Sequence, residues 1–157
     1  MKTLVLGIGN LIRGDDAVGI RIAQELARQV NAADIDVKYV CSDGLNLLEL
    51  IIGYDKLIVV DAIMVEGDKV GEVYRLKPQE IGVSYFPPIS AHHFNLASTI
   101  EMGNQLFPNE IPREVIIYAV GAKSTGEITE QMSDEVQEAM PGVANLIMTE
   151  LGQNPHL

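Results

Sequence analysis

The sequence contains only one cysteine, Cys41, and this scarcity excludes several kinds of site. A single cysteine cannot form an internal disulfide, a cysteine-rich metal site or a CxxC redox pair. We interpret Cys41 as a small buried hydrophobic residue at the end of a strand, because free cysteines usually pack in this way.

Basic residues are also few. Lys and Arg total 11 against 22 for Asp and Glu, which gives a formal net charge of −11. A surface this acidic repels phosphate backbones and anionic lipids. We therefore expect neither nucleic acid nor a membrane surface as a partner, whereas cations and basic peptides would be attracted.

Long apolar runs are missing as well. The longest mainly apolar stretches, such as 57–60 and 115–120, are far shorter than the roughly 20 residues that cross a bilayer. The first residues carry one lysine and an apolar run too short for a signal peptide. We expect a cytoplasmic protein, and the length of 157 residues predicts one domain that spans residues 1–157.

Short apolar runs alternate with segments whose apolar residues recur at helical spacing. We expect strands at 4–6, 37–41, 57–60, 71–76 and 115–120, and helices at 16–30, 45–52, 92–106 and 130–151. The last helix should be bent or broken at Pro141-Gly142. The continuous run at 57–60, which ends at Asp61, indicates a central parallel strand, and the alternating run at 71–76 indicates an edge strand, possibly antiparallel.

This alternation predicts an α/β protein: a three-layer α/β/α sandwich with a doubly wound, mostly parallel five-stranded sheet and helices on both faces. In such folds ligands bind at the carboxyl ends of the strands, where the direction of winding switches. Functional residues should therefore lie in the loops after Leu6, Cys41, Val60 and Val120, and in the loop that leads to His92.

The first loop, residues 7–16, places glycines between a strand and a helix, as nucleotide-binding loops do. A dinucleotide fingerprint needs its third glycine where Ile12 stands, and Asp15 and Asp16 would repel a pyrophosphate. The spacing thus disfavours nucleotide binding. Two interpretations of the acidic pair stay open: the carboxylates cap the helix that follows, or they act at the predicted functional edge.

Asp61 and His92 are further candidates at this edge. Asp61 directly follows the central strand, where it either caps a turn or faces a ligand. His92 and His93 are adjacent and point about 100° apart on a helix, so we expect only one of them to serve. Asp16, Asp61 and His92 would together supply two carboxylates and one imidazole, which suit zinc or nickel. The positive helix end favours a neutral, metal-binding imidazole.

Other catalytic schemes find no support in the sequence. There is no GxSxG elbow for a serine hydrolase and no HExxH helix, and Cys41 lacks a clear activating partner. Water activated by a metal or by a carboxylate could still attack a peptide bond.

Four motifs together resemble those of the [NiFe]-hydrogenase maturation endopeptidases. They are LVLGIGN at 4–10, GDDAVG at 14–19, LIVVDA at 57–62 and SAH at 90–92, the last followed by Leu96-Ala97. The likeness extends from Leu4 to about Gly121, and the order of the combined motifs is specific.

The resemblance implies a single-domain α/β/α, aspartyl-type endopeptidase that removes a C-terminal extension from the hydrogenase large-subunit precursor after nickel insertion. It implies that Asp16, Asp61 and His92 fill the family's metal-binding and catalytic positions. The nickel would be held by the precursor, and cadmium or zinc could replace it in crystals. Asp43 lies in Ser-Asp-Gly where the family often has Asp-Gly-Gly, so its role stays open.

Two rival functions use the same residues differently. A non-catalytic nickel-binding assembly chaperone for hydrogenase would need the same three donors without any cleavage, and a nucleotide-binding module would need only the first loop. The assignment of His92 over His93 rests on its position after Ser90-Ala91.

Overall fold

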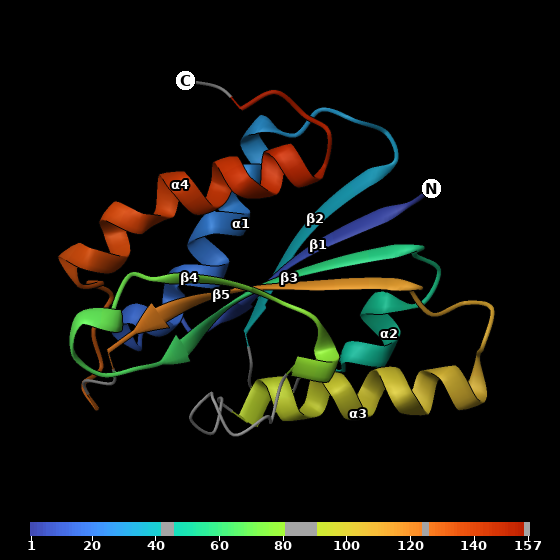
Figure 1. Cartoon of the computed structure of the whole chain (residues 1–157), viewed down its shortest axis with the longest axis horizontal. Helices are drawn as coiled ribbons and strands as arrows, with labels where there is room; N and C mark the ends of the chain where they lie inside the picture. Colours follow the sequence, from blue (N-terminus) through green and yellow to red (C-terminus); the bar gives the residue numbers. More distant parts are fainter. Residues whose placement is uncertain (42–45, 81–90, 124–125, 156–157) are drawn as a thin grey trace.

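The computed structural model describes residues 1–41, 46–80, 91–123 and 126–155, with the backbone alone for 91–95. The strands are β1 (Thr3–Gly9), β2 (Ile35–Cys41), β3 (Lys56–Met64), β4 (Val73–Leu76) and β5 (Glu114–Ala122). The α-helices are α1 (Val18–Gln29), α2 (Leu47–Ile51), α3 (Ala91–Leu106) and α4 (Asp134–Glu150) (Figure 1). Short 3-10 helices occupy Gly14–Ala17 (η1), Gly67–Lys69 (η2) and Pro78–Glu80 (η3).

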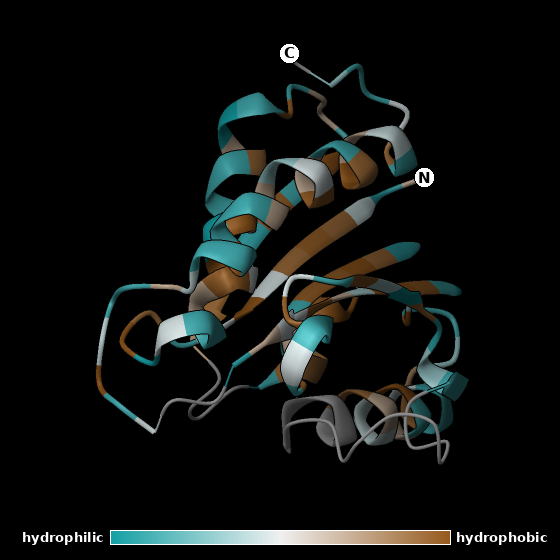
Figure 2. Ribbon diagram, turned by 60° about the vertical axis from the view of Figure 1, so that its left-hand side comes forward, coloured by the Kyte–Doolittle hydropathy of each residue, from teal (hydrophilic) through white to brown (hydrophobic). Residues whose placement is uncertain are grey.

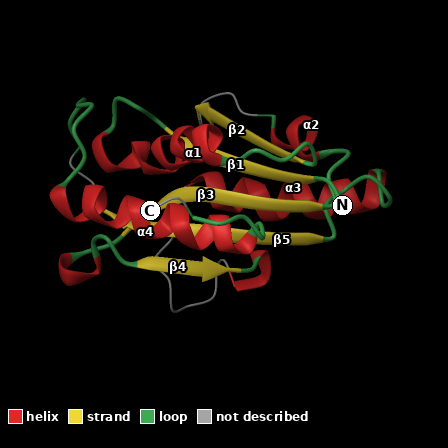
Figure 3. Cartoon of the chain, turned by 90° about the horizontal axis from the view of Figure 1, so that it is seen from above, coloured by secondary structure: helices red, strands yellow, loops and turns green. Residues whose placement is uncertain are grey.

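The strands form one sheet in the order β2-β1-β3-β5-β4 (Figure 3). All neighbours are parallel except β4, which pairs antiparallel with β5 at the edge. The chain passes from β1 to β2 on one side and then returns to β3 on the other, so the direction of winding switches between β1 and β3. This topology confirms the expected doubly wound sheet and its antiparallel edge strand.

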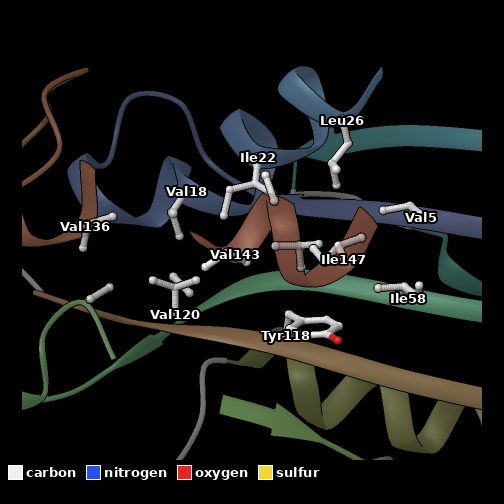
Figure 4. Close-up of a cluster of buried hydrophobic side chains, with 14 of the residues drawn as sticks. Val5, Val18, Ile22, Leu26, Ile58, Tyr118, Val120, Val136, Val143 and Ile147 are labelled. Carbon is white, nitrogen blue, oxygen red and sulfur yellow. The ribbon is translucent and has the colours of Figure 1, made fainter. Parts of the chain in front are cut away.

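Helices cover both faces of the sheet, with α1 and α4 on one face and α2 and α3 on the other (Figure 1). Alternate residues of β3 serve the two faces: Ile58 and Val60 pack beneath α1 and α4 (Figure 4), whereas Leu57 and Val59 pack against α2 and α3. The apolar residues lie along the central strands and the inner sides of the helices (Figure 2). The expected three-layer sandwich is therefore confirmed.

Two expected boundaries are wrong. β3 does not end at Asp61 but continues to Met64, because Ala62 and Ile63 are buried and stay paired with β5. The final helix was expected from residue 130 but begins at Asp134. It also runs across Pro141 without the break that the proline could cause. Buried residues on both sides of the proline hold the two halves of α4 against the sheet, which offsets the missing backbone hydrogen bond.

The interpretation of Cys41 as a buried residue is also wrong. Its side chain is exposed at the last position of β2, which is an edge strand of the sheet.

Within the described residues, no helix has the length and apolar character needed to cross a membrane.

Two glycines let the first helical segment lie directly on the ends of β1 and β3. A Cβ atom at Gly19 would overlap the carbonyl oxygens of Ile8 and Val60, and one at Gly9 would overlap the carbonyl oxygen of Asp16. Only glycine permits such a close approach of two backbones. The packing of η1 and α1 against the sheet thus explains these glycines without a bound nucleotide.

We expect Gly19→Ala to lower the free energy of unfolding by about 2 kcal/mol or more, because two fixed backbone carbonyls block the added methyl group. Gly142→Ala is the matched control: nothing lies within 4 Å of its added Cβ inside α4, so it should raise stability by about 0.5 to 1 kcal/mol. Urea unfolding of both variants tests this pair. Equal stability of the two would contradict the close-packing account.

Candidate functional site

Asp61 lies where the two central strands separate. The pairing of β1 with β3 ends at Gly7 and Val60, while β3 continues beside β5 with Asp61 opposite Ala119. Asp61 is therefore the first residue of β3 beyond its β1 partner, at the switch point where ligands bind in doubly wound sheets. It is 1% exposed. Residues two positions apart in a strand share a face, so Asp61 lies on the same face as Val59, which α2 and α3 cover.

The surroundings of Asp61 favour its protonated form. Burial is the main cause that raises its pKa well above the usual range, and the nearby negative charge of Asp16 raises this pKa further. The backbone N–H of Ala62 donates a hydrogen bond of 2.8 Å to Oδ1 of Asp61, which opposes the shift only in part. Two carboxylates from distant parts of the sequence thus act on each other at this edge.

Asp16 reaches this position because the first loop folds back on itself. Asp16 is half-buried in η1, and its backbone carbonyl accepts a hydrogen bond of 3.3 Å from the N–H of Asn10. The N–H of Asp16 in turn donates to the carbonyl of Arg13 at 3.2 Å. These bonds and the glycine at position 9 hold the Asp16 backbone against the end of β1.

His92 belongs to the first turn of α3, but its side chain and that of His93 lie outside the described residues. The backbone still places this turn. The segment after α3 bonds to residues 53–55 beside the amino end of β3, through Gly53 N–H to Glu110 O and Arg113 N–H to Asp55 O. Because α3 runs along the sheet, its first turn lies toward the carboxyl ends of the parallel strands (Figure 1).

The described residues do not test the predicted set of three donors. The charge of Asp16 acts on Asp61, and residue 92 lies in the first turn of α3. Among the side chains that are described, no group of three His, Cys, Asp or Glu residues could hold a metal ion. The assignment of His92 as a ligand, and any role of Asp43, which also lies outside the described residues, stay predictions.

Asp15 has a role that the sequence did not reveal. Neither Asp15 nor Asp16 caps α1, whose N-cap is Ala17. Instead, the Asp15 carboxylate accepts hydrogen bonds from Lys123 and Ser133, more than a hundred residues further along the chain. A serine directly before an acidic helix start suggests an N-cap at Ser133, but nothing in the sequence links it to Asp15.

Two exposed isoleucines lie in segments that a β-bridge joins. Arg13 and Thr129 form this parallel bridge, and Ile12 and Ile128 are the residues that directly precede them. Ile12 is 47% exposed and Ile128 is 83% exposed. We name this pair the isoleucine lip. Ile12 belongs to the loop that carries Asp16.

Comparisons with known proteins point to one family. The family model described as hydrogenase maturation protease matches residues 20–150. A hydrogenase 2 maturation protease of Escherichia coli is 29% identical over 121 residues, which are 76% of this chain and 73% of that protein. Protein FrxA of Pyrococcus furiosus is 28% identical over 137 residues, covering 87% of this chain and 95% of that protein.

A solved structure shows the same fold. The hydrogenase maturating endopeptidase HybD from Escherichia coli superposes with a TM-score of 0.79 at 24% identity, covering 97% of this chain and 93% of that one.

We expect Asp61→Asn to stabilise the protein at neutral pH. Because the pKa of Asp61 is raised above its ordinary value of 3.8, wild-type stability falls as the pH rises through the raised value. Asparagine has no proton to lose and can still accept the bond from Ala62. The variant should exceed wild type by at least about 1 kcal/mol at about pH 8.

Urea unfolding at several pH values measures this difference, which should disappear below about pH 4. Asp55→Asn is the control, since Asp55 is exposed and accepts a hydrogen bond from the N–H of Lys2. That variant should lose some stability. If Asp61→Asn were less stable than wild type at neutral pH, the surroundings of Asp61 would not disfavour its ionised form.

Proposed function

Because the chain belongs to the hydrogenase maturation protease family and is therefore a peptidase, we propose that it removes the C-terminal extension of a [NiFe]-hydrogenase large-subunit precursor after nickel has been inserted. The observation that carries this proposal is the position of the buried Asp61 at the switch point of the sheet, where the charge of Asp16 also acts on it.

Two carboxylates that repel each other form a ready site for a divalent cation. A cation between them would favour the ionised form of both, and would thereby oppose the effect of burial and of the Asp16 charge, which raise the pKa of Asp61. An imidazole from His92 would complete a set of two oxygen donors and one nitrogen donor, which suits nickel. In this proposal the nickel belongs to the precursor, and the three side chains recognise it as part of the substrate.

This recognition would bring the peptide bond to be cleaved to the same edge of the sheet. Asp61, when ionised, is a group that can accept a proton from an attacking water molecule, and Asp16 beside it can orient that water. Binding and hydrolysis would then depend on one cluster of side chains. Processing would be limited to precursors that have received their metal.

The proposal extends to the compartment and to the part of the precursor that is contacted. We place the reaction in the cytoplasm, since an unpaired, exposed cysteine such as Cys41 suits a reducing compartment. We also infer that the isoleucine lip contacts an apolar segment of the precursor, because both isoleucines are exposed and Ile12 belongs to the loop that carries Asp16.

The nickel dependence can be tested directly. We expect the protein to shorten a nickel-loaded precursor and to leave a nickel-free precursor intact, because in this proposal the nickel is the group that the two carboxylates recognise. Mass spectrometry of the precursor before and after incubation measures this. Equal cleavage of both forms would refute nickel recognition, and nickel transfer without loss of mass would instead indicate an assembly chaperone.

Single substitutions serve as controls for this experiment. Asp16→Asn, Asp61→Asn and His92→Ala should each slow processing by at least about 100-fold, since loss of a ligand costs at least as much as loss of its supporting partner. His93→Ala should be nearly as active as wild type. If His93→Ala is the inactive variant and His92→Ala is active, the ligand assignment moves by one residue.

Ile128→Asp tests the isoleucine lip. The substitution removes an exposed apolar contact and adds a charge, so we expect KM for the nickel-loaded precursor to rise about tenfold with little change in kcat. Leu146→Asp is the control, because Leu146 is an exposed apolar residue too, at 50%, but lies on α4. The same rise in KM for both variants would mean that the lip makes no specific contact.

A further inference from the structure

Asp15 is a buried carboxylate, and both of its oxygens accept hydrogen bonds. It is 2% exposed. The N–H of Ser133 donates to Oδ1 at 2.6 Å, while the N–H of Lys123 and the hydroxyl of Ser133 donate to Oδ2 at 2.8 and 2.9 Å. Three donors offset much of the cost of burying this charge.

The donors stand at the two ends of one connection. Lys123 directly follows β5, and Ser133 directly precedes α4, so a single side chain joins both ends of the segment between them. In the middle of this segment, the N–H of Thr129 donates to Ile12 O at 2.8 Å, and Thr129 O accepts from the N–H of Gly14 at 2.8 Å. The first loop is therefore fastened to the β5–α4 connection on both sides of Arg13.

Asp15 and Asp16 are neighbours in the single turn of η1. Successive residues of a 3-10 helix point about 120° apart, so the two carboxylates face different parts of the molecule. Asp15 faces the β5–α4 connection, whereas the charge of Asp16 acts on Asp61. Any rotation of this turn that loosens Asp15 also moves Asp16.

We propose that Asp15 is a positioning residue, whose bonds to Lys123 and Ser133 hold the η1 turn so that Asp16 stays beside Asp61. This inference rests on the proposed function for its effect on catalysis. Asp15 itself does not touch the substrate, and its oxygens are directed at the β5–α4 connection.

Asp15→Asn and Ser133→Ala test the proposal. Asparagine at position 15 presents an amide group to one of the backbone N–H donors, and alanine at 133 removes only the hydroxyl donor. We expect kcat/KM for the nickel-loaded precursor to fall about tenfold or more in Asp15→Asn and about threefold in Ser133→Ala. Ser133→Thr keeps a hydroxyl and should stay within about twofold of wild type.

Asp55→Asn is the matched control, since Asp55 also holds a backbone N–H, that of Lys2 at 2.7 Å, but at the opposite edge of the sheet. At a temperature where all variants are folded, it should leave kcat/KM within about twofold of wild type. A loss in Asp15→Asn that is matched by Asp55→Asn would assign Asp15 a purely structural role and overturn the proposal.

Hydrogen exchange supplies a readout that does not need the substrate. Amides in residues 12–18 and 126–133 should exchange about tenfold faster in Asp15→Asn than in wild type, with β3 and β5 unchanged. Unaltered exchange in residues 12–18 would overturn the proposal. If wild type does not cleave the nickel-loaded precursor, the proposed function fails, and exchange alone then decides whether Asp15 holds the turn.

Discussion

The close approach of the first helical segment to the ends of β1 and β3 is the constraint on which the rest of the structure depends. It is possible only because Gly9 and Gly19 lack a Cβ atom at points where two backbones meet. This contact holds the backbone of Asp16 against the end of β1, from where its charge acts on Asp61. The glycines of this loop thus serve to bring two backbones close together.

Carboxylates at the amino ends and at the carboxyl ends of the parallel strands have opposite electrostatic surroundings. At the amino edge, Glu150 bonds to Lys56, Arg75 and Tyr118 at 3.0 to 3.1 Å. The bond from Arg75 is the largest cause that lowers the pKa of Glu150 to about 2. At the carboxyl edge, burial and a second carboxylate raise the pKa of Asp61 instead. The first arrangement stabilises the fold, and the second is typical of a functional site.

The rest of the molecule holds in place the segments that carry Asp16 and Asp61. Apolar cores on both faces of the sheet fix β3, and the β5–α4 connection fixes the first loop through Asp15 and Thr129. A peptidase gains from fixed side chains at its site, because they need not be ordered when the substrate binds. The chain belongs to a family of proteases.

The sequence by itself determined the order of strands and helices, the antiparallel edge strand and the position of Asp61 at the end of the central apolar run. These features follow from local periodicity, so they could be predicted from neighbouring residues. The pairing of Asp16 with Asp61 was expected only because doubly wound sheets collect their loops at one edge.

Only the tertiary structure decided that β3 continues past Asp61, that Cys41 is exposed on an edge strand and that Asp15 bonds to Ser133. Each of these depends on what lies next to a residue in space. The partners of Asp15 are 108 and 118 positions away in the chain, and a contact at such a separation leaves no periodic pattern in the sequence.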